Sequence, residues 1–167
     1  MRWTVRTALG LAAMVLLAAC ASRPPAAPPR ADIFPAPMTE PMQCVPYARL
    51  ASGIEIYGDA HTWWAQAAGR YARGNRPALG AVLSLPRGQR LRHGHVAVVT
   101  RILGPREIRV AHANWGNTPA LRRRILRDHP AIDVSSGNNW SAVRFWNYEA
   151  ASYGGVYPAD GFIYRNR

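Results

Sequence analysis

Three short apolar runs, bounded by turn residues, lie in the middle of the 167-residue chain. They cover residues 77–86, 93–102 and 108–114, and Gly104 and Pro105 separate the second run from the third. Short apolar runs between glycine and proline are typical of β-strands, and a Gly-Pro pair indicates a turn. We therefore expect the second and third runs to pair as a hairpin, which favours a fold that contains an antiparallel sheet.

Polar side chains stand in line with the apolar faces of this predicted hairpin. Because side chains alternate along a strand, His95 shares a face with the apolar residues two and four positions after it. His112 and Asn114 likewise share a face with the apolar residues of the third run. This arrangement predicts a site at the edge of the core. The alternative for each histidine is a partly buried residue whose hydrogen bonds are satisfied.

The region after the hairpin predicts further strands at residues 132–135, 141–146 and 161–164. His129 directly precedes Pro130, and we interpret this pair as part of a turn. Trp140 is a candidate substrate-binding residue, because with Tyr153 it could offer a platform on which sugar rings stack.

Residues 41–53 predict a helix that begins close to Cys44. Proline is tolerated only in the first turn of a helix, so Pro46 defines the start, and Gly53 indicates the end. A cysteine at this position lies at the positive end of the helix dipole, which is expected to lower the thiol pKa and make a nucleophile. The backbone N–H groups there, and the side chain of Gln43, could hold an oxyanion. The alternative for Gln43 is an exposed polar residue.

The N-terminus has the pattern of an export leader. Residues 1–19 combine a charged start, an apolar run too short for a comfortable membrane span and a small-residue exit. Cys20 follows this exit directly, an order that resembles a bacterial lipobox, in which the cysteine is acylated and becomes the first mature residue. Residues 20–40, rich in proline and alanine, predict an extended tether. Residues 41–167 are then the folded domain.

These features predict an exported protein, anchored in the bacterial envelope by lipid on Cys20. Because position 21, directly after that cysteine, is not acidic, we expect the outer membrane, facing the periplasm, rather than the inner membrane. Cys44 is then the only free thiol of the mature protein. The periplasm is oxidising, so a lone thiol there is expected to be buried or used chemically.

The charge is strongly positive, and every one of the 21 cationic residues is arginine, against nine acidic residues, for a formal net charge of +12. Such a field favours polyanionic partners. Export excludes nucleic acid and leaves anionic lipid or an acidic wall polymer. The basic segment 122–127 could contact either, or it could be a solvated face. Potential metal ligands do not cluster at ligand spacing, and we expect no metal, no other cofactor and a monomer.

Taken together, four segments of the chain resemble the CHAP family, the cysteine- and histidine-dependent amidohydrolases/peptidases of the papain-like superfamily. The matching segments are residues 43–48, 77–82, 94–99 and 112–116.

This resemblance implies an α+β fold, with N-terminal helices packed on a twisted antiparallel sheet. It implies Cys44 as nucleophile and His95 as base. Many CHAP domains carry glutamate where this chain has His112, so either His112 or Asn114 is the residue that orients the base. Trp115 resembles the tryptophan that shields the orienting asparagine of papain-like enzymes; it is a candidate substrate-binding residue or a core residue.

The implied function is hydrolysis of an amide bond in peptidoglycan, as an amidase or an endopeptidase, through a covalent acyl intermediate. The alternative is a catalytically silent lipoprotein on the same fold, which binds the wall or acts as a scaffold.

Overall fold

An antiparallel sheet organises the part of the chain that the structure, a computed structural model, describes, which is residues 41–166. The predicted leader, Cys20 and the predicted tether lie outside the described residues. In chain order the elements are α1 (Cys44–Ser52), the 3-10 helix η1 (Ala60–Thr62), α2 (Trp63–Gln66), β1 (Ala72–Gly74), β2 (Val82–Leu85), β3 (His95–Gly104), β4 (Glu107–Ala113), α3 (Pro119–Arg122), β5 (Ile125–Asp133), β6 (Ala142–Asn147), β7 (Ser152–Tyr153), β8 (Tyr157–Pro158) and β9 (Gly161–Tyr164).

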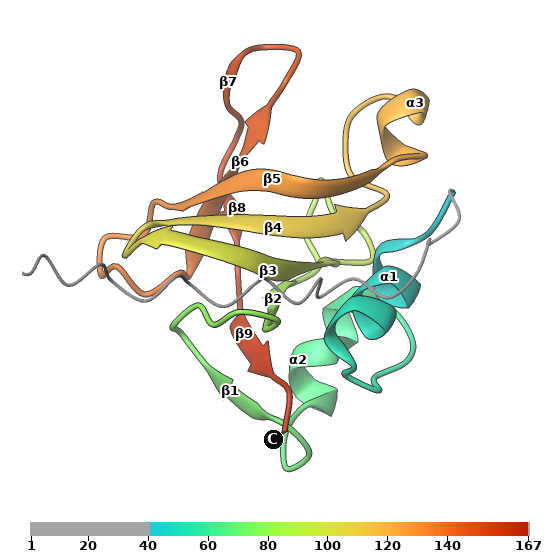
Figure 1. The fold of residues 1–167 in the computed structure, drawn as a ribbon, viewed down its shortest axis with the longest axis vertical. Coiled ribbons are helices and arrows are strands. Elements are labelled where there is room, and N and C mark those ends of the chain that lie inside the picture. The colour runs from blue at the N-terminus through green and yellow to red at the C-terminus, as the bar shows by residue number, and fades with distance from the viewer. Residues whose placement is uncertain (1–40, 167) are drawn as a thin grey trace, which may run out of the picture. The chain divides into compact units, whose positions relative to one another are not determined.

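The strands form one sheet in the order β1-β9-β2-β3-β4-β5-β6-β7, and β8 also pairs with β6 (Figure 1). Each pair of neighbouring strands in this sheet is antiparallel. The predicted hairpin is confirmed as β3 and β4, which are joined by a turn at Pro105 and Arg106. Its register places Val98 opposite Ala111, with a bulge between Val99 and Arg101.

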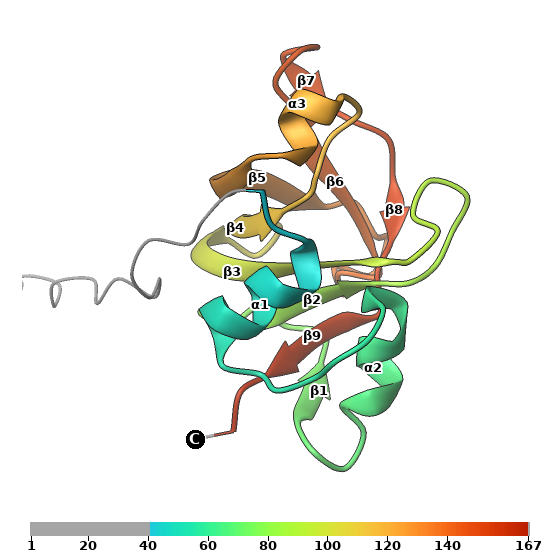
Figure 2. The same cartoon turned by 90° about the vertical axis from the view of Figure 1, so that its right-hand side faces the viewer.

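Alternation along β3 and β4 divides the apolar side chains between two clusters. Val96 and Val98 face helix α1 and share a cluster with its buried residues. Ala97 and Val99 point to the other side and join a cluster that includes Phe145 of β6 and Phe162 of β9. The sheet therefore curls around the second cluster, while α1 and α2 pack on its opposite face, where the first cluster lies (Figure 2).

Helix α1 begins and ends where the sequence predicts. Cys44 is its first residue, and Pro46 lies in its first turn. Gly53 ends it in the left-handed conformation (φ 70°), and its N–H donates to the carbonyl of Arg49 at 2.8 Å. The buried face, which includes Tyr47 and Ala48, packs against the sheet and so holds Cys44 beside β3.

The class is α+β with a small helical share, because α1 has nine residues and α2 and α3 have four each. The predicted run 77–86 contributes only the four-residue strand β2, since Gly80 (φ 77°) turns the backbone before it. None of the helices in residues 41–166 is long and apolar enough to cross a membrane.

Candidate active site

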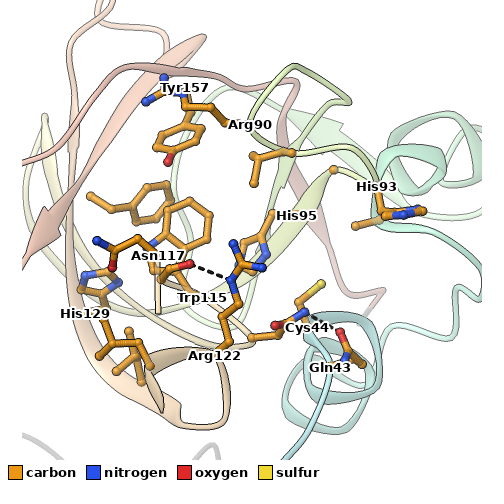
Figure 3. A pocket seen from close by; sticks show the side chains of 18 of the residues that line it. Gln43, Cys44, Arg90, His93, His95, Trp115, Asn117, Arg122, His129 and Tyr157 are labelled. Atoms are coloured by element: carbon orange, nitrogen blue, oxygen red, sulfur yellow. Dashed lines mark hydrogen bonds between the residues drawn. The ribbon is translucent and has the colours of Figure 1, made fainter. Parts of the chain in front are cut away.

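A cavity of about 1100 Å³ opens where the start of α1 meets the ends of β3 and β4 (Figure 3). Its lining brings together segments far apart in the sequence, from the loop before β3 to the loop after β4 and strand β6. Cys44, His95, Gln43, Asn114 and Trp115 all line it. Five of the candidate residues therefore meet at one place.

Cys44 is partly buried and is the free cysteine of the described chain. Burial raises its pKa above the ordinary value, although the backbone N–H groups of Val96 and Val45 act in the opposite direction. The expectation that the helix N-terminus lowers the thiol pKa is therefore wrong, because desolvation outweighs the backbone dipoles. In its resting state the group is a thiol, which needs a base before it can attack.

His95 is the first residue of β3 and is only 3% exposed. Gly94 positions it with a backbone φ of 70°, and a Cβ at Gly94 would lie 2.5 Å from the backbone nitrogen of His61 and 2.7 Å from the carbonyl oxygen of Leu85. Only glycine fits both the conformation and the space. Burial lowers the pKa of His95 to about 3, so its imidazole is neutral and can accept a proton.

His112 is the hydrogen-bond partner of His95. The Nε2 atom of His95 lies 2.9 Å from Nδ1 of His112, and the two rings meet edge to face. The register explains the contact: with Val98 opposite Ala111, His112 lies diagonally across the hairpin from His95, on the same face. His112 is fully buried, and burial lowers its pKa well below the ordinary value.

Asn114 does not share this face. The strand ends at Ala113, and Asn114 adopts a left-handed backbone with φ 54°. Its Nδ2 donates a hydrogen bond to Oε1 of Gln43. The expectation that Asn114 points with His112 toward His95 is wrong, because alternation holds only while the chain stays extended. Asn114 instead orients Gln43, whose amide nitrogen keeps its capacity to donate beside Cys44.

Trp115 covers the two histidines. Its ring centroid lies 4.6 Å from that of His95 and 5.2 Å from that of His112, and it stacks on the latter at 24°. Such a cover keeps water from the hydrogen bond between the imidazoles. Trp115 is partly buried against the second cluster and also lines the cavity, and its role in substrate binding stays a prediction.

Trp140 is not a sugar platform. It is 1% exposed, packs against Phe162 in the core and does not line the cavity. A buried indole has no open face on which a sugar could stack, so we withdraw this residue from the site. Tyr153 lies elsewhere, in contact with Trp146.

The structure adds His129, which sequence reasoning missed. It belongs to β5 rather than to a turn, is 1% exposed, and places Nδ1 at 2.8 Å from Nε2 of His112. The predicted turn was based on Pro130. This proline lies directly before Ala131, the first residue of β5 that pairs with β6, and a strand tolerates proline where that pairing has not yet begun. In the structure His129, Ala131 and Asp133 are all buried with the two-residue period of a strand, but a histidine, an alanine and an aspartate form no apolar pattern in the sequence.

The rim of the cavity is positively charged. Arg90, Arg92 and Arg122 line it, against Asp59 as the acidic residue of the lining. Arg122, from the predicted basic segment, donates to the carbonyl of Gly116 at 2.9 Å. This rim suits a substrate that carries carboxylates. Within residues 41–166, no group of histidine, cysteine, aspartate or glutamate side chains could hold a metal ion.

Comparison with known proteins assigns a family to this region. Residues 35–114 match the family model described as CHAP domain. No curated protein matches the chain. The matched range contains Cys44, His95, His112 and Asn114, whereas His129 lies beyond it. CHAP domains are amidohydrolases or peptidases in general. Residues 35–114 of this chain therefore belong to the CHAP domain family, a family of amidohydrolases and peptidases that includes hydrolases of peptidoglycan.

Proposed function

We propose that this domain hydrolyses an amide bond of peptidoglycan, with Cys44 as nucleophile and His95 as general base. The observation that carries the proposal is the meeting of both residues at one cavity, with His95 held through Nε2 by His112. That bond leaves Nδ1 of His95 as the nitrogen that can exchange a proton with the thiol.

The proposed reaction starts from a neutral thiol on Cys44 and a neutral imidazole on His95. His95 takes the proton of Cys44 as the sulfur attacks the amide carbonyl carbon, and a tetrahedral oxyanion forms. The carbon–nitrogen bond then breaks, and His95 returns the proton to the leaving amine. Water hydrolyses the thioester, again with His95 as base, and restores the thiol. Because burial favours the neutral form of both groups, proton transfer accompanies attack instead of preceding it.

The N-terminus of α1 supplies donors for the oxyanion. Backbone N–H groups in the first turn have no intrahelical partner, and they lie beside Cys44. Gln43 precedes the helix, and its amide oxygen is occupied by Asn114. The amide nitrogen of Gln43 is therefore the group that would donate a hydrogen bond to the oxyanion.

Peptidoglycan as substrate rests on the family and on the charged rim. Stem peptides of the wall carry carboxylates, which the arginines at the rim would attract. The proposed enzyme is either an amidase, which cuts at the sugar junction, or an endopeptidase, which cuts within the peptide.

The test is digestion of purified peptidoglycan, followed by mass spectrometry of the soluble fragments. We expect new amino and carboxyl termini at one type of amide bond, and we expect Cys44→Ala and His95→Ala to release none while they stay folded. If the wild-type protein binds the wall but releases nothing, the catalytically silent alternative is correct. Release by Cys44→Ala would exclude the covalent mechanism.

We further propose that the protein is a lipoprotein anchored at Cys20 and exported to the envelope. The support is the order of the leader, in which that cysteine directly follows an apolar run and small residues. We expect the protein from its bacterial host to partition into detergent, and Cys20→Ala to partition into water. Detergent partitioning that persists in Cys20→Ala would contradict this anchor.

A further inference from the structure

Three imidazoles form a continuous hydrogen-bonded chain that ends on a backbone carbonyl. His95 Nε2 meets His112 Nδ1 at 2.9 Å, and His112 Nε2 meets His129 Nδ1 at 2.8 Å. The remaining nitrogen of His129, Nε2, lies 2.6 Å from the carbonyl oxygen of Trp146. The three histidines come from neighbouring strands, β3, β4 and β5, and each is at most 3% exposed.

The carbonyl gives this chain a direction. A carbonyl oxygen only accepts hydrogen bonds, so Nε2 of His129 must carry the proton that it donates to Trp146. A neutral imidazole has one donor and one acceptor, so Nδ1 of His129 must accept from His112. His112 therefore carries its proton on Nε2 and accepts through Nδ1. By the same step, His95 carries its proton on Nε2, and its Nδ1 keeps a lone pair.

The surroundings of the three imidazoles favour their neutral state. Burial lowers the pKa of all three imidazoles. Each is further disfavoured as a cation by a charge or an imidazole nearby: Arg109 acts on His129, and His129 acts on both other histidines. The hydrogen bond to the Trp146 carbonyl opposes these effects at His129 but does not cancel them.

Aromatic rings hold the outer member of the chain in place. The His129 ring stacks on Phe145 at 5.8 Å and on Tyr148 at 5.4 Å, with interplanar angles of 28° and 22°. Phe145 also stacks on His112 at 5.7 Å. The imidazoles therefore have little freedom to rotate out of line, so the direction set by the carbonyl is transmitted along the chain. Figure 3 shows His129 across the cavity from Cys44.

We propose that His129 is a positioning residue that, through His112, imposes on His95 the tautomer with the proton on Nε2 and the lone pair on Nδ1. The inference rests on the proposed function for its catalytic meaning, since this is the tautomer that can take the thiol proton of Cys44. It extends the site beyond the matched family region, because His129 lies past residue 114. The base would be oriented by a backbone carbonyl, through the two imidazoles of His112 and His129, instead of by a carboxylate.

Two variants of His129 separate a positioning role from a packing role. His129→Phe keeps an aromatic ring in contact with Phe145 and Tyr148 but removes both hydrogen bonds. His129→Gln keeps one acceptor for His112 and one donor for the Trp146 carbonyl but removes the ring. A residue needed only for packing tolerates phenylalanine better, whereas a residue needed for the proton order tolerates glutamine better.

The first measurement is the ¹⁵N spectrum of the histidine side chains, which distinguishes a protonated ring nitrogen from an unprotonated one. In the wild type we expect His95, His112 and His129 all to carry the proton on Nε2. In His129→Phe we expect His95 to populate both tautomers, and in His129→Gln we expect the wild-type tautomer. The signals of His61 and His93, which lie outside the chain of imidazoles, serve as internal references that should not change.

The second measurement is hydrolysis of a peptidoglycan fragment by the same three proteins. We expect His129→Phe to lower kcat by on the order of 10²-fold with KM little changed, because general-base catalysis contributes at least that much. We expect His129→Gln to recover kcat to within about tenfold of the wild type.

The two measurements together decide the proposal. A wild-type His95 protonated on Nδ1 overturns it without any variant, which keeps it testable even if His129→Phe does not fold. It is also overturned if His129→Phe keeps both the tautomer and the rate, or loses rate with the tautomer unchanged. If the tautomers are as proposed but none of the three proteins hydrolyses peptidoglycan, the proposal for His129 stands and the proposed function fails.

Discussion

At the scale of single residues, the site separates two roles that the sequence places two positions apart. His112 bonds to His95, whereas Asn114 bonds to Gln43. In the proposed mechanism, His112 therefore acts on the base, and Asn114 acts on the oxyanion donor Gln43. The difference arises from one backbone change, the left-handed conformation of Asn114, which turns its side chain out of the alternation of β4.

Single substitutions at these two positions should have unequal effects. We expect His112→Ala to lower kcat by about 10²-fold or more, because His95 loses its partner. Asn114→Ala should lower it less, and by about as much as Gln43→Ala does. Since Asn114 acts through Gln43, the double variant of these two should be no slower than the slower single variant. Steady-state kinetics of the five proteins checks this. An almost inactive Asn114→Ala beside a fully active Gln43→Ala would contradict the assignment.

The reactivity of Cys44 toward an alkylating agent is a second prediction at this scale. Because burial raises the thiol pKa, Cys44 in the folded protein should be alkylated more slowly at neutral pH than a free cysteine. The rate should rise as pH increases and when urea unfolds the chain. The measurement uses Cys20→Ala, in which Cys44 is the only cysteine. Faster alkylation of the folded protein at neutral pH would mean that the helix N-terminus outweighs burial.

At the scale of elements, the site depends on where each strand starts and ends. β3 begins at His95, immediately after Gly94 has turned the backbone against η1. The N–H of His61 donates to the carbonyl of His93 at 2.9 Å, which fastens this turn to the 3-10 helix. The first residue of β3 is therefore placed by contacts with segments far from it in the sequence.

Gly94→Ala tests this placement, with Gly69→Ala as the matched control. Both glycines have a positive φ, but a Cβ at Gly69 would meet nothing within 4 Å. Gly69→Ala should cost about 1–2 kcal/mol from the left-handed backbone alone. Gly94→Ala should cost roughly 1–3 kcal/mol more, because the methyl group meets backbone atoms. It should also lower the hydrolysis rate, whereas Gly69→Ala should not. Urea unfolding and kinetics measure both, and equal effects of the two variants would contradict this account.

At the scale of the whole molecule, burial of three histidines makes stability depend on pH. Their pKa values are lowered in the folded protein, so below the unfolded value of about 6.5 the unfolded chain binds more protons than the folded one. The contribution of the three neutral histidines to the free energy of unfolding is therefore fully present above that pH. It falls as the pH decreases from about 6.5 toward the pKa values of the folded protein, and the pKa of His95 there is about 3.

We expect the free energy of unfolding to decrease by about 1.4 kcal/mol per pH unit for each buried histidine in this range. Urea unfolding at pH about 7.5 and pH about 5.5 measures the decrease. His129→Phe removes one of the three groups, so its decrease should be smaller than that of the wild type. A free energy of unfolding that is the same at both pH values would contradict the burial of the three imidazoles as neutral groups.

The sequence by itself determined the local features of this protein. Pro46 and Gly53 define the start and the end of helix α1, and Gly104 and Pro105 locate the β3–β4 turn. Alternation along the strands puts His95 and His112 on one face of the sheet. These follow from local rules, because proline and glycine restrict the backbone directly and an extended chain has a period of two. The four family segments likewise indicated Cys44 and His95.

Only the tertiary structure decided what depends on contacts between distant segments. The raised pKa of Cys44 needs the burial that the packed sheet and helix create, and the partner of Asn114 needs the start of α1 at its side. His129 joins the site because β5 pairs with β4 across a bulge between Val110 and His112. Register and desolvation are properties of the assembled sheet, and no single segment of the sequence carries them.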